Sequence, residues 1–301
     1  PRSTPKPSSA ASDVYKRQPL DYVVAAAVGF RVDSYLLREA EKLGELPPRR
    51  SERAYYPYKG GIVLPPKPGV HTNIAVLDFT SMYPNLMIAY NISPDTLVRG
   101  GSEPPEGVYE IPEVGYKFRR SPPGFYKNVL SKLIDARRQI RREAQGVGED
   151  ERRKILKERE KAIKILTNAV YGYAGWTGAR WYVKEVAEAT AALGRYTIKR
   201  LMKKAKELRL DVIYGDTDSI FVVYDVNLVN QLVGWVEEKM NLEVKVEKVY
   251  KRVLFTEAKK RYAGLLPDGR IEVVGLEVAR GDWCEAASCL LYTSDAADEG
   301  L

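Results

Sequence analysis

The sequence is poor in the side chains on which zinc sites and many hydrolases depend. Its 301 residues include two cysteines, Cys284 and Cys289, and a single histidine, His71. This shortage excludes a zinc site built from Cys and His and disfavours a Ser-His-Asp or Cys-His mechanism. His71 lies in the stretch PGVHTN and is expected to be a loop residue. Any chemistry must therefore rest on carboxylates, lysines, arginines and tyrosines.

Long apolar segments are also missing. No run of 18 apolar residues occurs, and the first 18 residues lack the apolar centre of a signal peptide. The sequence thus predicts a cytoplasmic protein that does not enter a membrane. Residues 1–18, which contain SAASDVYKRQ, and residues 289–301, which contain CLLYTSDAADEG, resemble translated sequencing adapters. We expect both segments to be foreign and the native product to extend further at both ends.

Acidic residues are outnumbered by basic ones. There are 48 Lys and Arg against 40 Asp and Glu, which gives a net charge of +8 and favours a polyanionic partner. Between Lys127 and Lys164, 13 basic residues face 7 acidic ones, so six of the eight excess charges lie in this one segment. A solvated helix face is the ordinary explanation of such a run, and a polyphosphate partner is the functional one.

The hydrophobic pattern predicts an α+β fold with a mostly antiparallel sheet and an inserted antiparallel helical hairpin. Apolar residues recur at helical spacing in six stretches, near residues 34–46, 84–91, 128–144, 151–173, 183–208 and 227–240. Strands are expected at residues 61–64, 74–78 and 212–224, and within 242–266 and 270–278. Residues 103–124 contain several prolines and are expected to form a loop.

Two aspartates interrupt an otherwise apolar segment, VIYGDTDSIFVVY, at residues 212–224. Its flanks suit strands and its centre suits a turn, so Asp216 and Asp218 are expected at the tip of a β-hairpin. In extended backbone such residues face one side and repel each other unless a cation lies between them. Asp78 ends another apolar strand, and central strands would bring all three acids to one edge. There they could hold two divalent ions about 4 Å apart for nucleotidyl transfer. A solvated surface turn is the alternative.

The predicted helical hairpin carries basic and aromatic side chains on shared faces. Lys164, Asn168 and Tyr171 are spaced at i, i+4 and i+7, and Arg137 and Arg141 at i, i+4. Two antiparallel helices can bring two arginines and a lysine together. That arrangement suits a triphosphate, because Arg binds it bidentately and Lys acts as a point charge. For Lys164 alone, an exposed lysine is the simpler explanation.

Several motifs, in order, resemble those of family B DNA-dependent DNA polymerases, closest to the archaeal replicative type. DFTSMYPNLM at 78–87 resembles the first polymerase motif, KILTNAVYG at 164–172 the second, and YGDTDS at 214–219 matches the third. YKGG at 58–61 resembles the motif that links the exonuclease and polymerase domains. KKRY at 259–262 resembles the stretch that holds the primer–template duplex. The resemblance extends from about residue 31 to 285.

The resemblance implies a polymerase palm interrupted by fingers. Its implied parts are a foreign leader, 1–18; a connection from the exonuclease part, 19–54; the first part of the palm, 55–124; the fingers, 125–175; the second part of the palm, 176–288; and a foreign tail, 289–301. The proofreading carboxylates would lie upstream and the thumb downstream. The chain is therefore expected to lack proofreading and to grip DNA poorly.

The same resemblance implies template-directed DNA synthesis, in which deoxynucleotides are added to a primer 3′-hydroxyl by two-metal transfer. Asp78, Asp218 and Phe79 would hold two Mg²⁺ ions, which Mn²⁺ can replace, with Asp216 in support. Tyr83 would exclude a 2′-hydroxyl. Further implied substrate-binding residues are Phe79, Ser81, Met82, Arg137, Arg141, Lys164, Asn168 and Tyr171.

DNA is the implied macromolecular partner, and the nucleoid-associated cytoplasm the implied location. The implied DNA-binding residues are Tyr58, Gly60, Gly61, Lys259, Lys260, Arg261 and Tyr262. Contacts of Lys and Arg with phosphates carry no sequence preference. Deoxynucleoside triphosphates and a sliding clamp, bound through the missing C-terminal part, are the other implied partners. Ala169, Met82 and Asn85 depart from the family pattern of Ser, Leu and Ser, and none of the three removes a ligand.

The residues alone leave two other functions open. Nucleotide-sugar glycosyltransferases also place Asp-x-Asp after an apolar strand, but they would not need the Lys164, Asn168 and Tyr171 face or the paired arginines. A non-catalytic nucleic-acid-binding module would use the positive charge and leave the carboxylates idle. Acids at a DNA-facing edge oppose phosphate binding in the absence of metal, which counts against that module.

Overall fold

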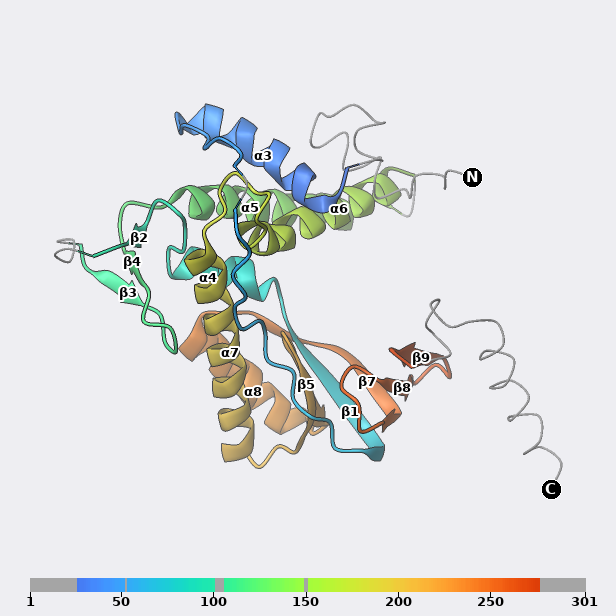
Figure 1. Ribbon diagram of the computed structural model, residues 1–301. Coiled ribbons are helices and arrows are strands. Elements are labelled where there is room, and N and C mark those ends of the chain that lie inside the picture. Colours follow the sequence, from blue (N-terminus) through green and yellow to red (C-terminus); the bar gives the residue numbers. More distant parts are fainter. Residues whose placement is uncertain (1–25, 52, 101–105, 149–150, 277–301) are drawn as a thin grey trace, which may run out of the picture. The chain divides into compact units, whose positions relative to one another are not determined.

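The computed structural model describes residues 26–51, 53–100, 106–148 and 151–276 (Figure 1). These residues form two compact units. The first contains the described residues up to Gly61 and those from Ser81 to Tyr196. The second contains Ile62 to Thr80 and the described residues from Thr197 onward. Within the described ranges, no helix is both long enough and apolar enough to cross a membrane.

The first unit is mainly helical. It contains α3 (Val28–Leu43), α4 (Met82–Ala89), α5 (Phe125–Gln145), α6 (Glu151–Ala174) and the first half of α7 (Lys184–Glu207). Helices α5 and α6 pack side by side, in green to yellow-green in Figure 1. The helical hairpin predicted for 128–144 and 151–173 is therefore confirmed.

Helix α5 begins earlier than its apolar spacing predicts, because its start is capped by residues distant in sequence. The Asp95 carboxylate accepts a hydrogen bond from the Phe125 amide at 3.1 Å, and the Ser93 hydroxyl accepts one from the Tyr126 amide at 3.1 Å. These acceptors satisfy amides that a helix start leaves unpaired. The local sequence at Gly124 contains no such capping side chain.

Residues 103–124 are not the plain loop that the prolines suggested. The segment contributes β3 (Val108–Glu110) and β4 (Lys117–Arg119), which join β2 (Leu97–Val98) in a small sheet ordered β2-β4-β3. Strands of two or three residues are too short to show a period-2 pattern. The fully buried Phe118 anchors this sheet.

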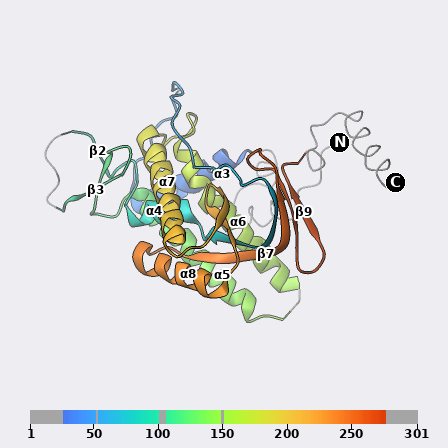
Figure 2. The ribbon, with the colours of Figure 1, turned by 90° about the horizontal axis from the view of Figure 1, so that it is seen from below.

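The second unit is built on one antiparallel sheet with the order β5-β6-β1-β7-β8-β9. Its strands are β5 (Val212–Asp216), β6 (Ser219–Val223), β1 (Gly69–Phe79), β7 (Val244–Phe255), β8 (Tyr262–Leu265) and β9 (Ile271–Val274). Figure 2 shows β7 curving between β1 and the β8–β9 hairpin. Helix α8 (Val226–Met240) contacts β7. The predicted hairpin at 212–224 and the antiparallel sheet are thus confirmed.

Two local predictions for the second unit were wrong. The strand expected at 61–64 is reduced to a single bridge between Val63 and Asp216. His71, expected in a loop, lies within β1 and pairs with Val253, because β1 continues through the turn-like residues before Ile74.

The core of the second unit is aromatic. Tyr214, Phe221, Tyr250 and Phe255 are buried together, and Tyr262 packs against them. Ring centroids of Phe221 and Phe255 are 5.4 Å apart at a near-perpendicular angle, a favourable geometry for aromatic pairs. This core supports β5, β6, β1 and β7, and so fixes the end of the sheet at which the aspartates lie.

Candidate active site

The three aspartates singled out in the sequence belong to the second unit. In the register of β1 and β6, Asp78 pairs with Ser219, and Asp216 pairs with the same residue from β5. The Phe79 amide donates a hydrogen bond to the Asp218 carbonyl at 3.0 Å. Strand pairing therefore brings the backbones of Asp78, Asp216 and Asp218 to one end of the sheet.

The hairpin tip is held in place by the segment just after Gly61. The Thr217 amide donates to the Ile62 carbonyl at 3.0 Å, and the Leu64 amide donates to the Gly215 carbonyl at 2.9 Å. A Cβ at Gly215 would lie only 2.7 Å from the Leu64 side chain, so a larger residue at position 215 would displace Leu64. A solvated surface turn would not be packed in this way, and the alternative explanation of Asp216 and Asp218 loses support.

The Asp216 carboxylate is paired with a lysine from the KKRY motif. Its Oδ1 lies 3.2 Å from Lys260 Nζ and accepts a hydrogen bond from the Thr217 hydroxyl at 3.0 Å. The Lys260 amide donates to the Tyr214 hydroxyl at 3.1 Å, and Lys260 itself has the left-handed φ of 64°. Two motifs that the sequence presents as separate signals are therefore in contact.

The donor atoms near Asp78 and Asp218 suit a hard cation. In the part of the chain that the structure describes, no group of three or more His, Cys, Asp or Glu residues converges as a metal cluster. Mg²⁺ commonly takes only one or two carboxylates and completes its shell with water and substrate phosphates. The carboxylates of Asp78 and Asp218 and the Phe79 carbonyl are oxygen donors of the kind that such an ion would take.

The first unit contains the paired arginines predicted from the helical hairpin. Arg137 donates to Glu160 Oε1 at 2.7 Å and to the Ser81 hydroxyl at 3.1 Å. Arg141 donates to the same Glu160 oxygen at 3.0 Å. The Arg137 side chain is 10% exposed, whereas that of Arg141 is 46% exposed. Arg137 is thus fixed in the protein, and Arg141 faces solvent.

Glu160 was missed in the sequence, where its only signal is its position four residues before Lys164. Burial alone would raise the pKa of Glu160, but its hydrogen bonds and charge interactions with Arg137 and Arg141 outweigh burial and lower that pKa. The carboxylate therefore stays ionised and holds two guanidinium groups together. Lys164 and Asn168 are exposed on the same helix, α6.

A pair of stacked tyrosines joins the first two polymerase-like motifs. The rings of Tyr83 and Tyr171 are stacked, with centroids 4.5 Å apart and an interplanar angle of 16°. Tyr171 also shares a hydrogen bond with Tyr58, and burial raises the pKa of both phenols above the ordinary value. A Cβ at Gly194 would lie 2.7 Å from the Tyr83 ring, so glycine leaves room for the stack. The Tyr83 ring is therefore packed between Tyr171 and the backbone at Gly194.

Comparison with known proteins identifies the family. The model of DNA polymerase family B matches residues 18–293, which is most of the chain and includes every candidate site residue described above. The chain belongs to DNA polymerase family B. The match reaches five residues into the segment 289–301, which lies outside the described residues.

Alignments with archaeal DNA polymerases span most of this family B chain. It is 59% identical over 271 residues to DNA polymerase 2 of Aeropyrum pernix and 46% identical over 275 residues to the DNA polymerase of Archaeoglobus fulgidus. These matches cover 89% and 90% of the chain but only 34% of either relative.

A solved structure agrees with these matches. The family B DNA polymerase of the hyperthermophilic archaeon Pyrobaculum calidifontis superposes with a TM-score of 0.80 at 51% identity. The superposition covers 94% of the chain and 37% of that polymerase. The chain thus spans about a third of the length of the polymerases it matches.

The YKGG segment of this family B chain is held by a buried arginine that sequence reasoning missed. Arg195, fully buried, donates to the carbonyls of Lys59 and Gly60 and to the Glu113 carboxylate, the Gly60 contact being 2.6 Å. The available signal was an arginine inside the apolar helical run AALGRYTI. Gly60 and Gly61 therefore lie in a backbone segment that Arg195 orients.

The four residues of KKRY in this family B chain lie in different surroundings. Lys259 and Lys260 are exposed and Arg261 is partly exposed. The Tyr262 ring lies 5.3 Å from both Phe221 and Phe255, and its hydroxyl is hydrogen-bonded to Tyr250. The ring of Tyr262 thus packs against the core, whereas Lys259 and Lys260 are exposed at the surface.

Proposed function

We propose that this chain carries the catalytic part of a DNA polymerase, which adds deoxynucleotides to a primer 3′-hydroxyl as a template directs. One observation carries the proposal: in a family B chain, strand pairing gathers Asp78, Asp216 and Asp218 at one end of the sheet. The substrates are primer–template DNA and deoxynucleoside triphosphates, and the reaction takes place in the cytoplasm. On the resemblance alone, a sliding clamp is a further partner.

Asp78, Asp218 and the backbone of Phe79 would hold two Mg²⁺ ions, which Mn²⁺ can replace. When bound, such ions lower the pKa of an attacking hydroxyl and neutralise the leaving pyrophosphate. The protein supplies a rigid platform, because Phe79 is tied to Asp218 by a backbone hydrogen bond and is 2% exposed. Rigid placement of ligands is a large part of what such a site contributes.

Residues of the first unit would bind the triphosphate. Arg141, Lys164 and Asn168 are exposed and can reach phosphate oxygens, as a cationic face does for polyanions. Arg137 would keep Ser81 and the start of α4 in place, so that the backbone from Phe79 to Met82 can receive the phosphates. The Tyr83 ring, fixed by its stack on Tyr171, would lie under the sugar and exclude a 2′-hydroxyl.

For Asp216 we propose a positioning role through Lys260. Its carboxylate already accepts from Thr217 and pairs with the Lys260 ammonium group, so it directs that cation towards the hairpin tip. Lys260, with Lys259 and Arg261, would contact the phosphates of the duplex. The other implied DNA-binding residues make contacts within the protein, and they would position the DNA-binding surface without touching DNA. These residues are Tyr58, Gly60, Gly61 and Tyr262.

Replacing Lys260 with alanine should weaken binding to primer–template DNA by about three- to tenfold and reduce the salt slope of log K by about one. Fluorescence anisotropy at several salt concentrations measures both quantities. Lys239→Ala removes a charge from α8, where Lys239 is paired with Glu238, and should change neither. Equal effects of the two substitutions would contradict a phosphate contact at Lys260.

The proposed function is tested by extension of a labelled primer by one nucleotide, with protein in excess over DNA. Incorporation that requires Mg²⁺ or Mn²⁺ and stops with a chelator supports the polymerase. DNA binding by folded protein without incorporation would instead favour the non-catalytic module. Turnover of a nucleotide sugar would favour the glycosyltransferase.

A further inference from the structure

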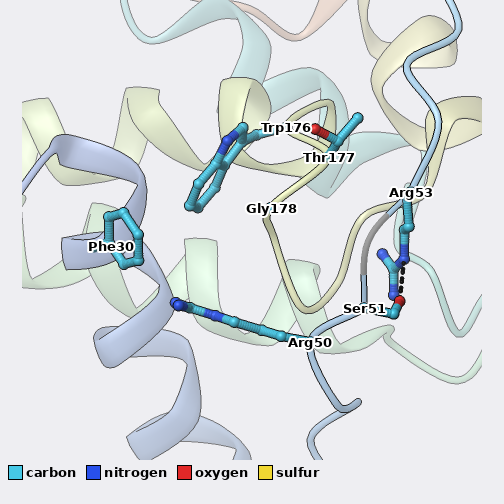
Figure 3. Close-up of a pocket in the computed structure, with 7 residues that line it drawn as sticks. All are labelled: Phe30, Arg50, Ser51, Arg53, Trp176, Thr177 and Gly178. Atoms are coloured by element: carbon cyan, nitrogen blue, oxygen red, sulfur yellow. Dashed lines mark hydrogen bonds between the residues drawn. The ribbon is translucent and has the colours of Figure 1, made fainter.

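An open pocket of about 620 Å³ lies in the first unit (Figure 3). Its cations are already engaged within the protein, since Arg53 donates to three backbone carbonyls and Arg50 pairs with the buried Asp33 carboxylate at 2.8 Å. The two guanidinium groups therefore support the walls of the pocket. A cation that is held in place and yet exposed lies in the second unit, in the turn that carries Lys260.

The residues between β7 and β8 form a turn that presents Lys260 at the surface. The turn runs from Thr256 to Arg261, and its two ends meet, because the Thr256 amide donates to the Arg261 carbonyl at 3.3 Å. Lys260 is exposed and has a left-handed φ of 64°, which is uncommon for a residue with a side chain. Such a backbone conformation persists only where the surrounding structure holds it.

The Thr256 side chain closes the turn from the inside. Its hydroxyl accepts a hydrogen bond from the Ala258 amide at 3.3 Å and donates one to the Arg261 carbonyl at 3.2 Å. Threonine and serine hydroxyls commonly close turns by bonding to nearby backbone groups. Thr256 thus links the two arms of the turn.

A glycine just after β9 packs against the same turn from the outside. A Cβ at Gly275 would lie 1.9 Å from the Lys260 carbonyl oxygen, closer than two non-bonded atoms can approach. Gly275 also has a left-handed φ of 63°, which glycine adopts without strain. Because the contact is with backbone, a side chain at position 275 could be accommodated only if the peptide that follows Lys260 moved.

The other contacts of Lys260 depend on the position of that peptide. The Lys260 amide donates to the Tyr214 hydroxyl at 3.1 Å, and the Lys260 ammonium group lies 3.2 Å from the Asp216 carboxylate. A shift of the Lys260 backbone would therefore disturb both contacts at once. The direction of the ammonium group is thus set by residues on both sides of the turn.

We propose that Gly275 and Thr256 are positioning residues for the phosphate contact of Lys260. Gly275 lets the chain after β9 approach the Lys260 carbonyl, and Thr256 holds the two arms of the turn together. The two residues keep a long, exposed side chain beside Asp216 before DNA arrives, which reduces the conformational cost of binding. The inference rests on the proposed function, in which Lys260 contacts the duplex.

Binding of primer–template DNA, measured by anisotropy at several salt concentrations without metal or nucleotide, tests the proposal. Gly275→Ala should weaken binding about threefold or more and lower the salt slope of log K towards that of Lys260→Ala. In a Lys260→Ala background, Gly275→Ala should weaken binding by less than about twofold further, because the group that it positions is gone. A loss of stability alone would not depend on Lys260 in this way.

Gly269→Ala is the matched control. Gly269 has a left-handed φ of 88°, but no described residue other than its chain neighbours lies within 4 Å of the Cβ that alanine would add. The substitution introduces similar backbone strain without the contact, so it should bind DNA as the wild type does. Thr256→Ala is the second variant and serves if Gly275→Ala does not fold. It should weaken binding about twofold, and Thr256→Ser, which keeps the hydroxyl, should restore it.

The inference is overturned if folded Gly275→Ala and Gly269→Ala bind DNA alike, or if Gly275→Ala weakens binding as much without Lys260 as with it. Circular dichroism establishes that each variant is folded. If Lys260→Ala binds as the wild type does, the phosphate contact of the proposed function fails and this inference fails with it. If Lys260→Ala binds weakly while Gly275→Ala and Thr256→Ala bind normally, this inference fails alone. Because no incorporation is measured, the outcome of the polymerase assay does not affect these results.

Discussion

Asp218→Asn is expected to abolish nucleotide incorporation, lowering the single-turnover rate by about a thousandfold or more. A metal ion contributes several kcal/mol of charge stabilisation to such a transfer, and about 4 kcal/mol corresponds to a factor of a thousand. Asparagine keeps the size and one oxygen of the side chain but loses the negative charge that a divalent ion needs. Asp78→Asn, on β1 opposite Ser219, the residue that follows Asp218, should have an effect of the same order.

Rapid chemical-quench measurement of one-nucleotide extension gives this rate, with DNA affinity measured in parallel. DNA binding should be kept or slightly strengthened, because removing an acid reduces repulsion of phosphate. Asp211→Asn is the matched control, since Asp211 directly precedes β5, the first strand of the hairpin whose turn contains Asp218, and is 57% exposed in an ion pair with Lys67. A folded Asp218→Asn variant that keeps a tenth of the wild-type rate would contradict the assignment.

Arg137→Ala is expected to raise the KM for deoxynucleoside triphosphate by about ten- to a hundredfold, equivalent to about 1.4–2.8 kcal/mol. The substitution removes a guanidinium group that links α5 to Glu160 and to Ser81 at the start of α4. It also leaves the Glu160 carboxylate with Arg141 as its remaining arginine partner, so that more negative charge faces an incoming triphosphate. A lysine at this position cannot reproduce the two-armed contact.

Steady-state extension at varied nucleotide concentration separates KM from kcat. Arg138→Ala serves as the control. The Arg138 side chain is 68% exposed and forms a long ion pair, at 3.5 Å, with Asp135 one helical turn away. Glu160→Gln separates the loss of positive charge from the loss of the contacts that Arg137 makes. It should lower the KM or leave it unchanged, because it removes the negative charge paired with both arginines. If Arg137→Ala and Arg138→Ala gave the same KM, the proposed role of Arg137 would fail.

Periodicity predicted the larger elements well. The hairpin from Val212 to Val223, the antiparallel sheet, and helices α5, α6 and α8 follow from apolar spacing and turn chemistry alone. The shared strand end of Asp78, Asp216 and Asp218 also follows, because a hairpin and a neighbouring central strand leave little freedom of register. The structure of long, strongly periodic segments can therefore be predicted from the local sequence.

Interactions between distant residues could not be predicted in the same way. The start of α5 depends on Asp95 and Ser93, about 30 residues earlier, and the YKGG backbone depends on Arg195, about 135 residues later. No local pattern encodes such partners. The short strands β2, β3 and β4 lie below the length at which alternation is visible.

Charge patterns did not predict pairing. The excess of positive charge between Lys127 and Lys164 left a solvated helix face and a polyphosphate partner both open, and it gave no indication that Glu160 would hold Arg137 and Arg141 together. Likewise, Asp216 and Lys260, which lie 44 residues apart, bring two motifs into contact. Ion pairs form where the fold brings side chains together, and the fold is not local information.

The most direct test of the account is template-directed incorporation by the wild-type chain. Four primer–templates that differ only in the first unpaired template base are each incubated with one deoxynucleoside triphosphate at a time and Mg²⁺, with protein in excess. The account predicts that each template directs addition of its Watson–Crick complement. A folded chain that binds the DNA but adds nothing, or adds the same nucleotide on all four templates, would contradict it.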